Sequence, residues 1–353
     1  MRKLKKGLKV LAALAAVILP LVLTAIAMAP TTSKGDLERD SSGLTKVSVQ
    51  IDGAATPYYA PLYLAQEKGY FADEGLDVEF YYASAAEIVK NVAAENVTFG
   101  FPNSDTVVMG RANNVPVKII HTTYQSSLGS IIYKTSSGMS SLKDLRGKTI
   151  AVTSFGSPNY IQLQVALQKA GLTTDDVNIK IIGTGGIVNA LATDQVDAIC
   201  FSMLRAYDLE AQGVDVGEFR AEDYLPGQGN VVITSDAFLQ NHRDVCEAFT
   251  RALNRSLDFI LDGNVRPAID LAIEKYAPAS AGSEERIEHV MEQEFVPKLW
   301  QSENTGAHGL GWSDADRYQN YIDILASYGI IENSYPSPEL FVNLMEVKQD
   351  EHE

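Results

Sequence analysis

Residues 56–71 read TPYYAPLYLAQEKGYF, and this stretch predicts a loop that leads into a short helix. Pro61 suits the first turn of the helix, because its ring presets the helical backbone angle and no helical hydrogen bond is lost. Gly69 suits the helix end, where a left-handed backbone costs glycine nothing. The helix is therefore expected to begin at Pro61 and to end at Gly69.

A strand is expected immediately before this loop. Val47, Val49 and Ile51 alternate with polar residues, which is typical of a strand that is buried on one face. Tyr58 and Tyr59 then follow the carboxyl end of the strand, and open α/β sheets bind ligands outside the carboxyl ends of their strands. The two tyrosines are therefore candidate ligand contacts.

Strand-like and helix-like segments alternate along the rest of the chain. This alternation predicts a mostly parallel sheet with helices on both faces. Strands are expected near residues 78–82, 97–101, 117–120, 131–133, 149–152, 177–182, 196–201 and 231–233.

Two later motifs extend the pattern: residues 142–150 read LKDLRGKTI, and residues 196–198 read VDA. Together with residues 56–71, they resemble the substrate-binding proteins of ABC importers, in the NMT1/THI5-like branch, over most of residues 46–260. The resemblance implies an α/β, type II periplasmic-binding-protein fold, with two α/β lobes and a ligand cleft between them. Such lobes are expected to close over the ligand by a hinge motion.

The resemblance and the segment pattern divide the chain into five parts. Two crossing segments, near residues 125–130 and 233–240, are expected to join the lobes. The expected parts are a signal peptide (1–29), a flexible spacer (30–45), lobe I (46–127), lobe II (128–235), and a return to lobe I with C-terminal helices (236–353).

The first 29 residues have the layout of a secretory signal peptide. Five basic residues precede an apolar run from Val10 to Ala29, which ends in two small-x-small cleavage candidates. The run is also long enough for an uncleaved membrane anchor. Either reading predicts export across the cytoplasmic membrane, to a periplasmic location or a membrane-associated one on the outer face.

Composition and cysteine use exclude other classes. The chain carries 29 Lys and Arg against 45 Asp and Glu, a net charge of −16. A domain this acidic repels phosphate backbones, which argues against nucleic-acid binding. Cys200 and Cys246 give no disulfide framework, and buried free thiols are expected.

The sequence carries no recognised catalytic or metal-binding motif. The five histidines lack a zinc-site spacing, and no nucleophile elbow or phosphate loop is present. The family resemblance includes self-consuming pyrimidine synthases, which carry a histidine where Tyr59 stands and a cysteine-rich run where residues 227–230 stand. These departures favour a binding protein without a cofactor or metal, although His121 keeps the synthase open as an alternative.

Candidate ligand contacts are polar or aromatic residues at expected strand ends and helix starts. Tyrosine rings can stack on a ligand, and the helix start at Ser157–Pro158 offers N–H groups to a carbonyl or anionic oxygen. The candidates are Asp52, Tyr58, Tyr59, Asn103, Tyr124, Ser157, Asn159, Tyr160 and Ser202.

The expected ligand class follows from one residue that differs between this chain and the related pyrimidine binders. Related pyrimidine binders carry Trp directly after the residue aligned with Asp52, whereas Gly53 stands here. Losing the indole should open the pocket, which favours riboflavin over a thiamine pyrimidine precursor. A binder of aliphatic sulfonate or nitrate is a further alternative. The expected partners of this monomer are an ABC permease and its ATPase.

Overall fold

The structure is a computed structural model that describes residues 37–344. The predicted signal peptide, residues 1–29, and residues 30–36 of the predicted spacer lie outside the described residues. Both sheets belong to one unit of contacts, which begins at Arg39.

The described end of the predicted spacer is a tight turn that leads into the first strand. Arg39 pairs with Thr45 as an antiparallel bridge. The carboxylate of Asp40 accepts hydrogen bonds from two backbone N–H groups within the turn. Local bonds of this kind, between an aspartate and the backbone two or more residues on, stabilise turns.

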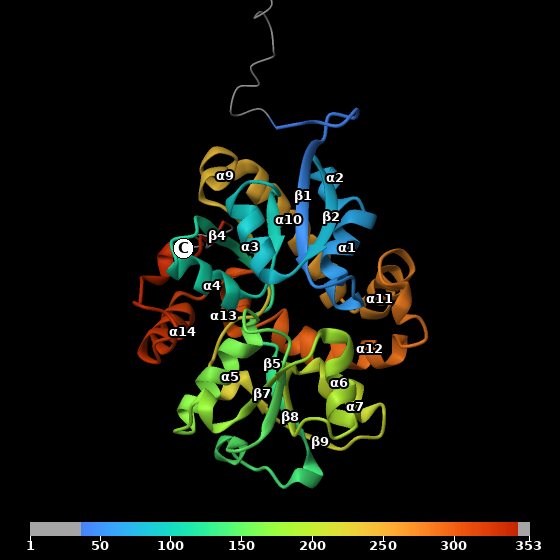
Figure 1. Ribbon diagram of the computed structural model, residues 1–353. Coiled ribbons are helices and arrows are strands. Elements are labelled where there is room, and N and C mark those ends of the chain that lie inside the picture. The colour runs from blue at the N-terminus through green and yellow to red at the C-terminus, as the bar shows by residue number, and fades with distance from the viewer. Residues whose placement is uncertain (1–36, 345–353) are drawn as a thin grey trace, which may run out of the picture. The chain divides into compact units, whose positions relative to one another are not determined.

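The first sheet has the strand order β2-β1-β3-β10-β4, and its strands β1, β2 and β4 are labelled in Figure 1. Its strands are β1 (Thr45–Asp52), β2 (Leu76–Ala83), β3 (Phe99–Phe101), β4 (Val117–Thr122) and β10 (Val231–Ser235). β1 runs parallel to β2 and β3, whereas β10 runs antiparallel to β3 and β4. β10 therefore lies inside the first sheet, although it follows the whole second sheet along the chain.

The second sheet has the order β7-β6-β8-β5-β9. Its strands are β5 (Gly129–Lys134), β6 (Thr149–Val152), β7 (Asn178–Ile181), β8 (Ala198–Ser202) and β9 (Val216–Arg220). The sequence pattern does not predict β9, because this edge strand is only half-buried along its length and carries no apolar run. The other strands lie within two residues of their predicted bounds.

Helices connect and cover the strands. They are α1 (Ala60–Glu67), α2 (Tyr70–Asp73), α3 (Ala85–Ala93), α4 (Ser104–Ala112), α5 (Pro158–Lys169), α6 (Thr184–Ala192), α7 (Leu204–Glu210), α8 (Ala221–Tyr224), α9 (Asp236–Asn241), α10 (Arg243–Leu261), α11 (Val265–Lys275), α12 (Glu284–Val290), α13 (Glu303–His308) and α14 (Ala315–Ser327). A π-helix, Met291–Leu299, continues α12. None of the helices within residues 37–344 is both long and apolar enough to cross a membrane.

The expected start and end of α1 are confirmed. Pro61 occupies the first turn, and Gly69 has a left-handed backbone with a φ of 74°. The loop before α1 is more ordered than expected, because Pro57–Tyr59 forms a 3₁₀ turn. Both tyrosines of that turn lie close to the carboxyl end of β1, where the hydroxyl of Tyr59 bonds to the Asp52 carbonyl.

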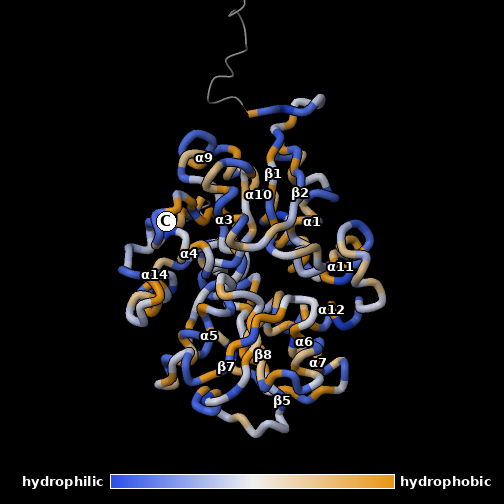
Figure 2. The backbone as a smooth tube through the Cα atoms, in the orientation of Figure 1, coloured by the Kyte–Doolittle hydropathy of each residue, from blue (hydrophilic) through white to orange (hydrophobic). Residues whose placement is uncertain are grey.

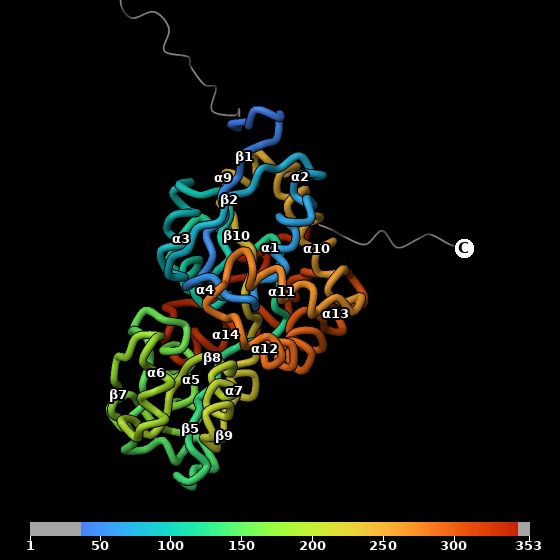
Figure 3. The backbone as a smooth tube through the Cα atoms, turned by 90° about the vertical axis from the view of Figure 1, so that its right-hand side faces the viewer, coloured from blue at the N-terminus to red at the C-terminus, as the bar shows by residue number. Residues whose placement is uncertain are grey.

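Amphipathic helices cover both faces of the first sheet. In Figure 3, α3 lies on one side of β10 and β2, and α10 on the other. Residues of α10 spaced three or four apart are buried, including Phe249, Leu253 and Leu257, as a helix with one apolar face requires. Phe249 stacks on Phe71 with ring centroids 4.9 Å apart. In the second sheet, β8 is a hydrophobic strand whose first three residues are buried (Figure 2).

Two segments cross between the sheets, one before β5 and one before β10. They pair through the backbone: Tyr124 N–H donates to the Asn230 carbonyl at 2.9 Å, and Gly229 N–H donates to the Tyr124 carbonyl at 2.8 Å. The second crossing therefore lies before residue 231, and the prediction of a crossing at 233–240 is wrong. Residues 231–235 are already a strand of the first sheet, held there by pairing with β4.

Candidate ligand-binding site

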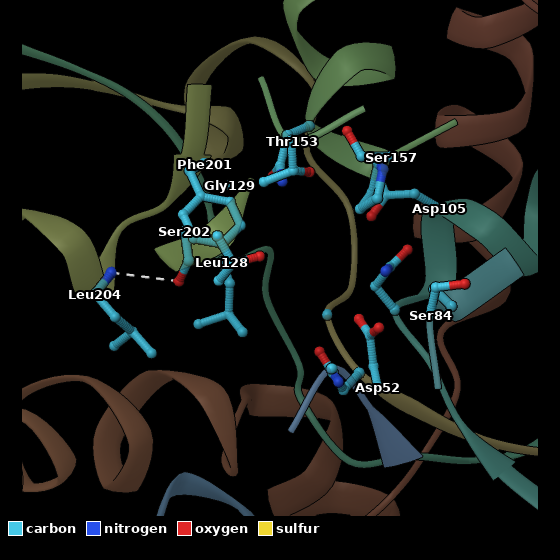
Figure 4. Close-up of a pocket in the computed structure, with 18 of the residues that line it drawn as sticks. Asp52, Ser84, Asp105, Leu128, Gly129, Thr153, Ser157, Phe201, Ser202 and Leu204 are labelled. Carbon is cyan, nitrogen blue, oxygen red and sulfur yellow. Dashed lines mark hydrogen bonds between the residues drawn. The ribbon is translucent and has the colours of Figure 1, made fainter. Parts of the chain in front are cut away.

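A cavity of about 700 Å³ lies between the two sheets. The ends of β1 and β3 and the first turn of α4 line it from the first sheet. The end of β8 and the loop from β6 to α5 line it from the second (Figure 4). A volume of this size is in the range that small-molecule sites have.

Eight of the nine residues proposed from the sequence line this cavity, and Tyr160 does not. They are Asp52, Tyr58, Tyr59, Asn103, Tyr124, Ser157, Asn159 and Ser202. Tyr160 packs instead against Phe155, with ring centroids 5.1 Å apart. Successive helical residues point about 100° apart, and this rotation places Asn159 in the cavity wall and Tyr160 beside Phe155.

Asp52 ends β1 and points into the cavity (Figure 4). Burial raises the pKa of its carboxyl group to about 6, although hydrogen bonds from Asn103 and from the backbone of Ala85 and Gly53 favour the charged form. The Asn103 side-chain oxygen accepts from Thr106 N–H and caps α4. The Asn103 amide nitrogen is therefore the group that donates to Asp52. The remaining acceptor capacity of the carboxylate suits a ligand N–H group.

The two tyrosines of the entry loop already have partners within the protein. The ring of Tyr58 stacks on Phe295, with centroids 5.0 Å apart and planes 4° from parallel. The hydroxyl of Tyr59 donates to the backbone carbonyl of Asp52 at 2.9 Å. Burial raises the pKa of Tyr58 to about 12, so its ring stays neutral. Each tyrosine thus builds the cavity wall as well as facing its interior.

Tyr124 links this wall to the first crossing segment. Its hydroxyl donates to the Tyr58 carbonyl at 2.9 Å. Its ring meets Phe101 and Phe295 edge-on, with centroids 5.8 and 5.4 Å away. Edge-to-face packing of several rings holds each in one orientation, so the aromatic wall is formed before any ligand arrives.

The second sheet contributes hydroxyl groups whose hydrogen bonds are largely made. Ser157 caps α5 by accepting from Tyr160 N–H, and its hydroxyl donates to the Ser154 carbonyl at 2.8 Å. Ser202 accepts from Leu204 N–H at 3.3 Å, as Figure 4 shows. Ser157 therefore fixes the start of α5, which carries Asn159, and Ser202 fixes the end of β8, which carries Phe201.

Several residues that line the cavity are not among the site residues predicted from the sequence. Phe295 lies in the π-helix, far along the chain, and no local pattern predicts its approach. Asp105 and Arg205 did carry a signal, because each is a charged residue just after a strand end. Phe201 ends a predicted strand and faces the cavity beside Ser202.

Asp105 is buried where three helices meet. Its carboxylate accepts from the Tyr321 hydroxyl of α14 and from the Gln162 amide of α5, the latter at 3.3 Å. Burial raises the pKa of Asp105. Its hydrogen bond with Gln162 links α4, which follows β3 of the first sheet, to α5, which follows β6 of the second sheet.

His121 and the two cysteines lie outside the cavity lining. His121 is buried, and its ring nitrogens bond to Thr123 and Asn254 at 2.8 and 2.7 Å. Burial lowers its pKa to about 4. Cys200 and Cys246 are buried free thiols, as predicted. Among residues 37–344, no cluster of three or more His, Cys, Asp or Glu could hold a metal ion.

Two known proteins resemble this chain in sequence over most of its length. The riboflavin-binding protein RibY of Chloroflexus aurantiacus is 27% identical over 323 residues, which cover 91% of each chain. A 4-amino-5-hydroxymethyl-2-methylpyrimidine phosphate synthase of Aspergillus parasiticus is 26% identical over 322 residues, covering 82% of this chain and 90% of its own.

A solved structure resembles this one in fold. The alkanesulfonate-binding protein SsuA of Xanthomonas axonopodis pv. citri, bound to MOPS, superposes with a TM-score of 0.66 at 14% identity. The match covers 84% of this chain and 98% of that protein. Together with the two sheets, it shows that this chain has the predicted periplasmic-binding-protein fold with two α/β lobes.

The family follows from a profile match. The profile of the NMT1/THI5-like family matches residues 56–264, more than half of the 353 residues. This span begins in the entry loop, includes the whole second sheet and ends just after α10. The chain therefore belongs to the NMT1/THI5-like family.

Proposed function

We propose that this protein captures a planar N-heterocyclic vitamin or vitamin precursor outside the cytoplasm and delivers it to an ABC permease with its ATPase. Riboflavin is the favoured ligand, and a thiamine pyrimidine precursor is the next. The observation that carries the proposal is the cavity itself. It combines a preformed aromatic wall at Tyr58, Tyr59 and Tyr124 with the buried carboxylate of Asp52.

Aromatic side chains and the acceptor oxygens of Asp52 suit a flat ring with N–H groups. Stacked or edge-on rings add about 0.5–1.5 kcal/mol each beyond the burial of their area. Gly53 leaves room beside Asp52, because nothing lies within 4 Å of where a Cβ would stand. The space there is consistent with a ring system larger than a pyrimidine. The riboflavin-binding relative supports the same choice.

A self-consuming pyrimidine synthase is the second candidate, because a synthase matches most of this chain. Within the described residues, neither histidine nor cysteine lines the cavity. His121 is held by Thr123 and Asn254, away from the cavity. A binder is therefore favoured over a histidine-consuming enzyme.

Fluorescence titration tests the binder directly. Riboflavin emission is expected to quench on addition of the purified protein, with an aminopyrimidine and an aliphatic sulfonate as competitors. Quenching that only the aminopyrimidine reverses supports the proposal. Absence of binding by riboflavin and the aminopyrimidine, with binding of the sulfonate, would assign the protein to the anion binders.

Mass spectrometry separates the binder from the synthase. The protein is incubated with pyridoxal phosphate and iron, and its intact mass and His121 peptide are then measured. An unchanged mass is expected. Conversion of a histidine would overturn the binding proposal in favour of the enzyme.

A further inference from the structure

Arg205 is the one cationic residue among those that line the cavity within the described chain. It lies in the first turn of α7, directly after β8. Its guanidinium lies 5.3 Å from the centre of the Phe201 ring, and Phe201 also faces the cavity. A planar cation above an aromatic ring is held in one orientation by the charge distribution of the ring.

Part of the hydrogen-bonding capacity of Arg205 is unused. Its Nη1 pairs with Asp208 at 2.6 Å. Its Nε is buried and has no hydrogen-bond partner. Buried N–H donors are nearly always satisfied in native proteins. The free Nε of a side chain that lines the cavity therefore indicates that the guanidinium still has a hydrogen bond to make there.

The charge around Arg205 is also incompletely neutralised. Asp208 is shared, because Arg286 binds its other oxygen at 2.5 Å. The nearby carboxylate of Glu294 is already paired with Arg220 and Lys298, at 2.9 and 3.2 Å. Two guanidinium groups thus share one carboxylate, and one positive charge remains available at the cavity wall.

We propose that Arg205 and Phe201 form the subsite that holds an oxygen-bearing edge of the ligand. The oxygen belongs to a ring carbonyl or to a phosphoryl group carried by the ligand, since both accept from a guanidinium. Asp52 lies at the end of β1, on the opposite side of the cavity from Phe201 (Figure 4). A ligand that spans the cavity therefore offers an N–H edge to Asp52 and an acceptor edge to Arg205.

This inference rests on the proposed function and narrows its ligand class. A heterocycle that carries both an N–H donor and an oxygen acceptor can meet both sides. A simple apolar ring, or a ring with donors alone, would leave the Nε of Arg205 unpaired. Arg205 is then a residue that determines specificity, and the aromatic wall supplies affinity common to any flat ring.

The test replaces the guanidinium and varies the oxygen. Affinities of the parent and of Arg205→Met are measured by fluorescence for three probes: riboflavin, riboflavin 5′-phosphate, and lumichrome, which keeps a tricyclic ring without the sugar chain. Loss of a charged hydrogen bond predicts a weakening of about 10- to 150-fold. Equal losses for all three identify the ring carbonyls as the acceptor, and a loss confined to the phosphate identifies the phosphoryl group.

Two further variants separate this contact from a folding defect. Arg286→Met is the matched control, because Arg286 shares Asp208 but does not line the cavity, and it should bind the probes within about threefold of the parent. Arg205→Lys keeps the charge and should recover part of the lost affinity. Parent-like binding of every probe by Arg205→Met would overturn the subsite. Failure of the parent to bind any probe or an aminopyrimidine would instead overturn the proposed function, and the subsite with it.

Discussion

Asp52 places a carboxylate where it is costly to ionise. Its folded pKa, raised by burial to about 6, exceeds the ordinary value of 3.8. The native state therefore binds more protons than the unfolded state between these values, and stability is lost as pH rises from about 4 to about 6. The ionised carboxylate is the stronger acceptor for a ligand N–H, so affinity should rise as the pH passes through about 6. Stability and binding thus respond to pH in opposite directions.

Asp52→Asn should separate these two effects. The amide keeps the shape of the carboxyl group without its charge. At pH 8 the ligand-free variant should be more stable than the parent by up to about 3 kcal/mol. The rise in riboflavin affinity through pH 6 should disappear. Urea unfolding and fluorescence titration at pH 4.5, 6 and 8 measure both, and a parent-like pH profile in the variant would exclude Asp52 as the titrating group.

Tyr58 and Tyr59 should differ in what their hydroxyls do. Tyr59→Phe removes the bond to the Asp52 carbonyl and should cost about 0.5–1.5 kcal/mol of stability. Tyr58→Ala removes the ring stacked on Phe295, and should cost about 2–3 kcal/mol together with a drop in affinity. Tyr58→Phe, the matched control, keeps the stack and should change either property little. Ala variants at both positions that bind riboflavin like the parent would show that the rings serve packing alone.

At the scale of elements, the start of α5 both caps a helix and contributes residues to the candidate site. Ser157 caps the helix and so sets the direction in which Asn159 enters the cavity. Ser235 caps α9 by the same bond, to Phe238 N–H at 2.8 Å, but does not line the cavity. A comparison of variants at the two caps therefore separates the loss of helix stability from the loss of ligand positioning.

Ser157→Ala and Ser235→Ala should each cost about 0.5–2 kcal/mol of stability. Of the two, only Ser157→Ala should also weaken ligand binding, because α5 contributes residues to the cavity wall and α9 does not. Chemical unfolding and titration of both variants provide the comparison. Equal losses of affinity would mean that the effect of Ser157 is global rather than local.

Local signals predicted elements better than they predicted the site. Pro61 and Gly69 mark the bounds of α1 because each acts through its own backbone angles. Tyr160 was assigned to the cavity from its neighbourhood in sequence, and the rotation of α5 turns it away. Phe295 could not be found at all, because it reaches Tyr58 through tertiary packing of a distant π-helix. Strand ends identify the edge where a ligand binds, but side-chain direction needs the packed structure.

At the scale of the whole described chain, the two crossing segments pair with each other where the lobes are joined. The position of this pairing bears on how the lobes can close. Gly229 lies where a Cβ would approach the Ser126 carbonyl to 2.7 Å. A side chain there must separate the two segments. Closure of the lobes over a ligand is expected to use this place as its hinge, so the radius of gyration should fall when ligand saturates the parent protein.

Gly229→Ala should disturb both stability and closure. Overpacking typically costs about 1–3 kcal/mol, and the compaction seen by solution scattering should shrink. Gly185→Ala is the control, because nothing lies within 4 Å of its Cβ position. Parent-like compaction in Gly229→Ala would place the hinge elsewhere, and no compaction in the parent would exclude closure as the binding mechanism.

Because β10 lies inside the first sheet, this sheet cannot be completed until late in the synthesis of the chain. β3 and β4 cannot pair through a common neighbour until residues 231–235 have been made. Until then both present unpaired edges, which favour association with other chains, and pairing over so long a stretch of sequence is slow. The first sheet thus stays incomplete until residues 231–235 have been made. Such a delay would suit the export that its N-terminal segment predicts, since a polypeptide is threaded across a membrane most easily before its sheets have closed.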